Sequence, residues 1–394
     1  MNVSNTTINK IDKFYDNISI PIENVTEKNK KVIQGIYNDI DKFYNECTKE
    51  NIYLNVVHIK NNTSIPYPTN YSLKYFPLEI QNYINESSTY YIESSLKIDK
   101  RSMNVKFIFQ DEYTSSSQKK VKKYLHDIYV WFHILNKYSL YKCSPRMSVF
   151  VYMTNMKKYI PTSKLEGINT IHVNSAFTNS CPVNGDITIY RKEEWFKVFI
   201  HETFHAYGMD FSSMNVSKSC ERIKKIFKIN QDIMLYEAYT ETWAEIINVI
   251  FCCHSIKLKD KNTDLASIFD VLINVEREHS IMKMIKVLDH VQIKYKMFID
   301  KNVDMIVYHE DTNTFSYYVI KCILLFTYNK FIQWCDKSNV IPMMFKNTLE
   351  NIDFFCDLIE KHYKSKTLLE SLEKVEKNMK NHNKNLRMSY SELS

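Results

Sequence analysis

Residues 198–211 read VFIHETFHAYGMDF and place His201, Glu202 and His205 inside an otherwise apolar stretch. Histidines four positions apart on a helix lie on one face, one turn above the other. Two neutral imidazoles in this arrangement can bind one Zn²⁺, and the adjacent glutamate can take a proton from a metal-activated water. Because HExxH fixes only three positions, it also occurs by chance. The rest of the chain must decide between a metal site and a coincidence.

A second group of acidic residues follows downstream, in the stretch LYEAYTETWAEII. Glu237, Glu241 and Glu245 are four apart, so a helix aligns their carboxylates on one stripe. Such a stripe is commonly the solvent-facing side of an amphipathic helix. Here it shares its helix with large apolar residues, and buried carboxylates are costly unless they are paired or bind a metal. Together with HETFH, it predicts the third protein ligand that a zinc site requires.

These two motifs resemble those of the gluzincin metallopeptidases, which have the zincin fold. The resemblance covers about residues 170–250 and is one of motifs. It implies that His201 and His205 are zinc ligands, and that a glutamate on the following helix completes the site. It also implies that Glu202 is the general base.

The third ligand has two possible positions in this resemblance. In thermolysin-like and clostridial-collagenase-like members, the ligand glutamate precedes a small residue and has an acidic residue one turn later, which fits Glu237, Ala238 and Glu241. In lethal-factor-like members the ligand opens an ExFAE run, which fits residues 241–245. We favour Glu237 as the ligand, with Glu241 as the carboxylate that orients an imidazole. Glu241 as the ligand is the alternative.

The metzincin pattern HExxHxxGxxH is a further possibility, since Gly208 falls three residues after His205. Its third ligand would be at position 211, which is Phe211, and Asp210 is one residue out of register. We therefore interpret Gly208 as the glycine that ends the helix.

Two other features belong to the expected active site. Residues 173–178 resemble the edge strand of zincins, along which a peptide or protein substrate would bind by adding a strand. A peptidase also needs a donor for the developing oxyanion. The candidates are Tyr236, Tyr239, Tyr308 and His309.

The predicted function is therefore zinc-dependent hydrolysis of peptide bonds through a metal-activated water, with Glu202 as the general base and Zn²⁺ as the cofactor. The alternative is a non-catalytic virion or scaffold protein that retains a zincin fold. Retention of Glu202 beside both histidines favours the enzyme.

The predicted fold class is α+β, with a zincin-like catalytic core of a mixed sheet plus active-site helices and a helical C-terminal portion. The expected division is an N-terminal α/β portion (1–140), the catalytic core (141–260) and the helical portion (261–394). Hydrophobic periodicity predicts elements as follows. Helices are expected over 27–48 and 115–138, and a hairpin over 90–99 and 105–110. Other strands are expected over 51–60, 147–153 and 186–190, with an extended segment over 170–178. The chain is expected to begin with a loosely ordered lead-in (1–28) and to end in a charged tail from about residue 364.

The composition is that of a globular protein, with 394 residues, 44% apolar residues and 25% charged residues. The net charge of +7 is dispersed, so no nucleic-acid partner is expected. No signal peptide and no membrane span is recognisable. Abundant Tyr (28) and Phe (22) with only 4 Gly are typical of an AT-rich genome, such as that of a large DNA virus.

Nine cysteines occur without CxxC pairs. Those in apolar surroundings are Cys252, Cys253, Cys322, Cys335 and Cys356. We expect all nine to be free thiols, which indicates a reducing compartment and a soluble protein of the host cytoplasm or virion. The sequence leaves the oligomeric state open.

Overall fold

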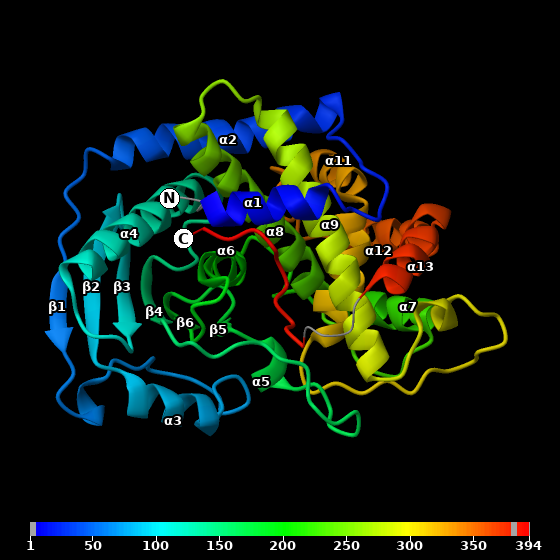
Figure 1. Ribbon diagram of the computed structural model, residues 1–394, viewed down its shortest axis with the longest axis horizontal. Coiled ribbons are helices and arrows are strands. Elements are labelled where there is room, and N and C mark those ends of the chain that lie inside the picture. Colours follow the sequence, from blue (N-terminus) through cyan, green and yellow to red (C-terminus); the bar gives the residue numbers. More distant parts are fainter. Residues whose placement is uncertain (1–4, 380–383, 394) are drawn as a thin grey trace.

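The computed structural model describes residues 5–379 and 384–393, and a single mixed sheet forms one side of it (Figure 1). The sheet has six strands in the order β1-β2-β3-β4-β6-β5. Their bounds are β1 (Asn55–His58), β2 (Tyr90–Ile98), β3 (Arg101–Phe109), β4 (Arg146–Tyr152), β5 (Ala176–Thr178) and β6 (Asn184–Ile189). The combination of a mixed sheet and many helices is compatible with the predicted α+β class.

The pairing of neighbouring strands changes between antiparallel and parallel at two places in the sheet, at β3 and at β6. β1, β2 and β3 are antiparallel neighbours, β3, β4 and β6 are parallel, and β5 is an antiparallel edge strand beside β6. The predicted hairpin is confirmed, but its turn is shorter than expected, because Arg101 already pairs with Ile98. Asp99 adopts a positive φ of 50° in that turn, a conformation that aspartate tolerates better than most residues. Residues 101–104, expected in the turn, therefore belong to β3.

Thirteen helices complete the described chain. Their bounds are α1 (Asn5–Tyr15), α2 (Glu27–Cys47), α3 (Leu78–Ser87), α4 (Ser115–Tyr138), α5 (Thr170–Val173), α6 (Trp195–Ala206), α7 (Ser217–Phe227), α8 (Leu235–Lys259), α9 (Leu265–His290), α10 (Lys321–Phe326), α11 (Tyr328–Ser338), α12 (Leu349–His362) and α13 (Lys366–Asn378). A π-helical stretch, η3 (Phe315–Ile320), runs directly into α10, and short 3₁₀ turns occur at η1 (Asn62–Ser64) and η2 (Tyr295–Phe298).

Helices cover both faces of the sheet. On one face, α4 and α6 pack through a large apolar core that includes Val105, Leu125 and Phe199 and continues into α8 and α9. On the other face, α3 packs Ile80 and Ile84 against a smaller cluster. The alternation of buried and less buried residues along β2 follows from the pleat, which turns successive side chains to opposite faces. In Figure 1, α6 lies between the sheet and the helices of the C-terminal part.

The helices α2 and α4 and the strand β4 confirm the predictions for residues 27–48, 115–138 and 147–153 to within a residue at each end. Two segments expected to be irregular or extended are helical instead. Within residues 1–28, α1 is a helix whose Ile11 is buried in the main core, so the described part of this lead-in is ordered. Within residues 170–178, α5 forms one helical turn before β5, because the Asn169 side chain accepts a hydrogen bond from the Ile171 amide and caps the turn.

The charged tail expected from about residue 364 forms α13 and, beyond it, a segment of residues 384–393 that packs on the rest of the protein. Leu386, Met388 and Leu393 are buried in it. Buried Glu194 accepts hydrogen bonds from the amides of Met388 and Ser389 over 3.2 and 2.6 Å. Buried Glu276 does the same for the next two amides in the chain. The segment, drawn in red in Figure 1, therefore runs along the start of α6 and is held by buried carboxylates.

The expectation of nine free thiols is wrong in one respect. Cys143 and Cys181, separated by 38 positions, form a disulfide, and the other seven cysteines are free. The five cysteines predicted to be buried thiols are all buried and free. The pairing escaped the sequence because the two cysteines come together only when the loop before β4 meets the loop between β5 and β6.

Within the described residues, no helix combines the length and the apolar character needed to cross a bilayer.

Candidate metal centre

The HETFH motif lies on α6, whose two ends are fixed by unusual backbone conformations. Glu194, the residue before the helix, has φ of 59°, and Gly208 has φ of 64° just after it. The Gly208 amide donates to the His205 carbonyl and the Met209 amide to the Phe204 carbonyl, so the last carbonyls of the helix are satisfied. Gly208 is thus the helix-ending glycine expected from the sequence. A Cβ there would also lie 2.9 Å from Cys143 Sγ.

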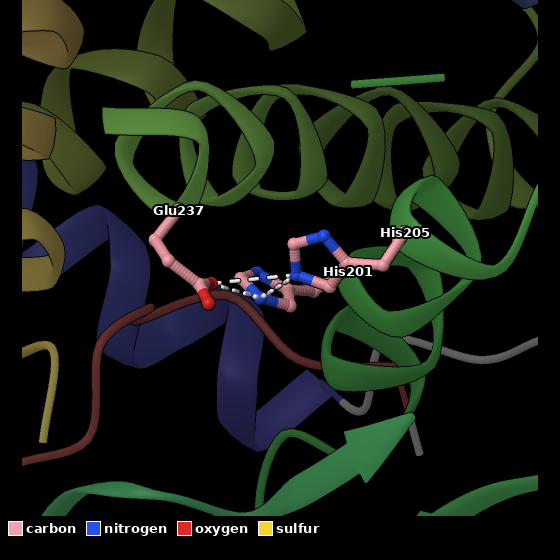
Figure 2. A group of neighbouring side chains, drawn as sticks. All are labelled: His201, His205 and Glu237. Atoms are coloured by element: carbon pink, nitrogen blue, oxygen red, sulfur yellow. Dashed lines mark hydrogen bonds and ion pairs between the residues drawn. The ribbon is translucent and has the colours of Figure 1, made fainter. Parts of the chain in front are cut away.

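Three side chains of α6 and α8 converge on one point. His201 and His205 come from successive turns of α6, and Glu237 comes from the first turn of α8, as Figure 2 shows. The two Nε2 atoms are 3.1 Å apart, and Glu237 Oε2 lies 3.2 Å from Nε2 of His201 and 3.3 Å from Nε2 of His205. All three residues are buried. This group could therefore hold a metal ion.

The separations fit the size of a zinc site. Ligands about 2.0–2.1 Å from a tetrahedral Zn²⁺ lie about 3.3–3.4 Å from one another. The three observed separations of 3.1, 3.2 and 3.3 Å are close to that value. Two imidazoles and one carboxylate also form a known catalytic zinc donor set that leaves a fourth position open.

The other nitrogen of each imidazole is bound by a carboxylate. Nδ1–H of His201 donates to Glu241 Oε2 over 2.8 Å, and Nδ1–H of His205 donates to Asp210 Oδ2. With the proton on Nδ1, the lone pair of each ring is on Nε2, the atom that faces Glu237. Glu241 and Asp210 therefore orient the rings. Glu241, the alternative third ligand, does not belong to the three-residue group, and Asp210 contacts the ring and not the metal position.

The acidic stripe of α8 is buried along its whole length. Glu241 also accepts a hydrogen bond from Lys197 Nζ over 2.5 Å, and Glu245 accepts one from Lys321 Nζ over 2.8 Å. Because α8 lies between α6 and α10, each carboxylate has a separate partner on a neighbouring helix. The stripe is not the solvent-facing side of a helix, because all three carboxylates are buried, and each contacts a lysine or a histidine inside the protein.

Glu202 lies beside the metal group and lines the same pocket. Its side chain is buried, and burial raises the pKa of its carboxyl above the ordinary value for glutamate. The rings of His201 and His205 lie close enough to the Glu202 carboxyl to oppose that rise in part. It is the one carboxylate next to the group that is neither a ligand candidate nor a partner of an imidazole.

Residues from five parts of the chain line this pocket, which has a volume of about 190 Å³. Ala176, Phe177 and Thr178 of the edge strand form one side. The Tyr190 amide donates to the Ser175 carbonyl, so the pairs 175/190 and 177/188 are the hydrogen-bonded ones in this antiparallel pair. Along an edge strand, the backbone N–H and C=O groups of successive residues point alternately toward the neighbouring strand and away from it. Those of Ala176 and Thr178 therefore point toward the open edge of the sheet. An edge strand was expected over 173–178. The observed strand, β5, covers Ala176–Thr178, and Val173 belongs to the helical turn α5.

The four candidate oxyanion donors are dispersed. Tyr236 lines the pocket, and its ring centre lies 5.7 Å from that of His205. Tyr239 is buried and donates to the Met343 carbonyl, and Tyr308 donates to Glu310. His309 is exposed and pairs with Asp311. Of the four, the structure brings Tyr236 alone to the pocket.

The sequence analysis missed three site residues, which are Asp210 beside His205 and two residues that contact Glu237. The Tyr317 hydroxyl donates to Glu237 Oε2 over 3.0 Å, and Asn313 Nδ2 donates to Glu237 Oε1 over 3.1 Å. Both line the pocket, and Tyr317 belongs to the π-helical η3. π-Helical turns are frequent at functional sites, and they shift side chains off the usual helical face. No motif in the sequence marks either residue, because both reach Glu237 from 76 and 80 positions away.

The chain was compared with protein-family models, with curated proteins and with solved structures, and no match was found in any of the three. The site itself brings together His201, His205 and Glu237, with Glu202 beside them. An interpretation of the site therefore rests on its donor atoms, on the carboxylates that contact the rings and on the adjacent open edge strand.

Proposed function

We propose that the protein is a zinc-dependent peptidase of the gluzincin type, built on a zincin-like core. The observation that carries the proposal is the convergence of two Nε2 atoms and one carboxylate oxygen at zinc-ligand separations. Behind them, Glu241 and Asp210 hold both rings with Nε2 turned inward. Zn²⁺ in such a site polarises a peptide carbonyl and lowers the pKa of water.

Glu202 is the proposed general base. Its carboxylate takes a proton from the attacking water and passes it to the amine that leaves when the C–N bond breaks. Its burial supports this role, because a raised pKa brings a carboxyl closer to the pH at which it must both accept and donate. The hydroxyl of Tyr236, which lines the pocket, can donate to the developing oxyanion, whereas the Tyr317 hydroxyl already donates to Glu237.

The open edge of β5 is the proposed substrate platform. An extended peptide can pair with the outward N–H and C=O groups of Ala176 and Thr178, which gives affinity without sequence preference. Because Ala176 and Glu202 line the same pocket, this pairing would place the peptide backbone beside the base. A non-catalytic scaffold would have no use for the buried carboxylate of Glu202 at this position.

The seven free cysteines support a location in a reducing compartment, such as the host cytoplasm or the virion. The Cys143–Cys181 disulfide counts against it, since disulfides persist in oxidising surroundings. Counting thiols in protein isolated from its source, with a thiol block at lysis, measures which state exists there.

The test of the proposed function combines metal content with cleavage. We expect about one Zn²⁺ per wild-type chain and hydrolysis of a mixture of quenched fluorescent peptides. Glu202→Gln should keep the zinc and lose at least about 100-fold in kcat/KM, the usual range for a general base. His201→Ala/His205→Ala should lose both zinc and activity. Full zinc content in the double variant, or equal cleavage by Glu202→Gln, would overturn the proposal.

A further inference from the structure

We infer that this site cleaves internal peptide bonds next to uncharged side chains and does not remove terminal residues. The inference rests on the proposed peptidase function and concerns the class of substrate. An exopeptidase must recognise a charged chain end, either an α-ammonium or an α-carboxylate. In a partly desolvated pocket that charge requires an opposite charge which is not already used by another group.

A free C-terminal carboxylate finds no cation in this pocket. Among residues 5–379 and 384–393, no lysine or arginine lines it. Lys158 and Lys197 reach an adjoining recess behind His201 and Glu202. Their ammonium groups are buried and bound, to Glu194 over 3.2 Å and to Glu241 over 2.5 Å respectively. A substrate carboxylate would have to break a buried ion pair to use either one.

A free N-terminal ammonium likewise finds no spare carboxylate. Of the described side chains that line the pocket, the acidic ones are Glu202 and Glu237. Glu237 is a ligand candidate that also accepts from Tyr317 and Asn313, and Glu202 has the proton-transfer role. Asp210 lies nearby but is occupied by His205 and Ser212. An ammonium held by Glu202 would remove the base from the reaction.

The edge strand also favours an internal segment. It offers two residues, Ala176 and Thr178, whose backbone groups face outward and are two positions apart. A substrate that pairs with both must be extended over at least three residues, since alternate residues of a strand face the same neighbour. Pairing of this kind uses only the backbone N–H and C=O groups of the peptide, so it does not require a free N- or C-terminus.

The side of the pocket near the start of α8 is apolar. Tyr75 and Met234 are each 39% exposed there, and Tyr236 lies beside them. Exposed aromatic and thioether side chains around a concave site favour an apolar or aromatic substrate side chain. A charged side chain would be desolvated at this wall without a partner. The preferred residue next to the cleaved bond is therefore uncharged.

The first experiment compares chain ends on one sequence. A peptide of about eight residues with a central aromatic residue is prepared with acetylated and amidated ends and with free ends. We expect zinc-loaded protein to cleave both at the same internal bond, with kcat/KM within about threefold. Aminoacyl arylamides and N-blocked dipeptides should be cleaved at least about 100-fold more slowly. The Glu202→Gln protein should bind both octapeptides with dissociation constants within about threefold, measured by fluorescence anisotropy.

The second experiment introduces a charge at the apolar wall. Met234→Lys should raise kcat/KM for a peptide with aspartate next to the cleaved bond, relative to its neutral parent, by at least about 10-fold. Met234→Glu should do the same for a lysine peptide. Leu165→Lys, at a position that is 95% exposed and outside the pocket, is the matched control and should change neither ratio. Zinc content is measured for each variant.

The outcomes separate the two proposals. Stepwise release of terminal residues, or strict dependence on a free end, would overturn the endopeptidase inference and leave the peptidase function standing. If both Met234 variants keep the wild-type preference between charged and neutral peptides, the side of the pocket near Met234 does not contact the residue next to the cleaved bond. No cleavage of any peptide by zinc-loaded protein would overturn the proposed function and this inference together.

Discussion

Nδ1 of His201 lies 2.8 Å from Oε2 of Glu241, on the ring nitrogen that does not face the metal position. This contact separates the two glutamates that the sequence left as alternatives. Glu237 Oε2 lies 3.2 Å from Nε2 of the same ring, one helical turn away along α8. The register of α8 therefore places Glu237 in the group that could hold a metal ion, and Glu241 against the ring of His201.

The first prediction follows from that assignment. Glu237→Gln should abolish high-affinity zinc binding, because it removes an anionic ligand. Glu241→Gln should still bind zinc, with affinity lowered about 10–100-fold, because it disturbs only the orientation of a ligand. Competition with a chromophoric chelator measures both affinities, and circular dichroism checks the fold. Tighter zinc binding by Glu237→Gln than by Glu241→Gln would assign the ligand to position 241.

The second prediction concerns the buried pair of Lys321 and Glu245, whose side chains are 1% and 0% exposed. Lys321→Met leaves a buried carboxylate without its cation and should lower the free energy of unfolding by about 3–5 kcal/mol. Lys321→Met/Glu245→Leu should recover most of that loss, because no charge stays buried. Urea unfolding measures both. Lys330→Met, at an exposed lysine on α11, is the control and should change stability by less than about 0.5 kcal/mol.

The third prediction is a thiol count. Under denaturing, non-reducing conditions the protein should show seven free thiols, and after reduction nine. Cys143→Ser/Cys181→Ser should show seven in both conditions. To preserve the state of the cysteines, free thiols are alkylated at lysis and the adducts are counted by mass. Nine adducts on unreduced wild-type protein would mean that Cys143 and Cys181 are reduced.

The fourth prediction concerns pH and Glu310. Burial raises the pKa of this carboxyl to about 8, although Tyr308 and the Phe315 amide donate hydrogen bonds to it. In the unfolded chain its pKa is about 4.3. A raised pKa means that its contribution to stability is complete below about pH 4 and is lost as the pH rises to 8.

The Glu310→Gln side chain has no proton to lose, so the variant should become more stable relative to the wild type as the pH rises. The difference in free energy of unfolding between variant and wild type should widen by at least about 2 kcal/mol from pH 5 to pH 8 and then stay constant. Urea unfolding at several pH values measures it. Glu350→Gln, at an exposed position, should show no such trend. A constant difference across this range would show that Glu310 ionises normally.

The sequence was sufficient where a helical period decides geometry. Spacings of four put His201 and His205 on one face of α6 and aligned Glu237 with Glu241 on α8, so both halves of the metal group could be placed without the structure. The long helix α4 was found for the same reason, since its apolar face repeats with the helical period over 24 residues.

The remainder depended on contacts between distant segments. Tyr317 and Asn313 reach Glu237 across 80 and 76 positions, and nothing local marks one tyrosine among 28. No sequence motif marks the Cys143–Cys181 disulfide, because it joins two loops that are 38 positions apart and come together only in the folded protein. α1 is a polar helix whose order comes from docking its few apolar residues on α9, which local composition does not reveal.

The attachment of residues 388–391 to Glu194 and Glu276 has a consequence for biosynthesis. Glu194 directly precedes the helix that carries both histidines, yet the amides that satisfy it are 194 and 195 positions later in the chain. While the ribosome is still making that stretch, Glu194 and the lysines beside it would be buried without those amides if α6 docked. The docked position of α6 therefore gains these hydrogen bonds only after residues 388–391 have been synthesised. In a growing chain, the group of His201, His205 and Glu237 forms without this support until that segment has left the ribosome.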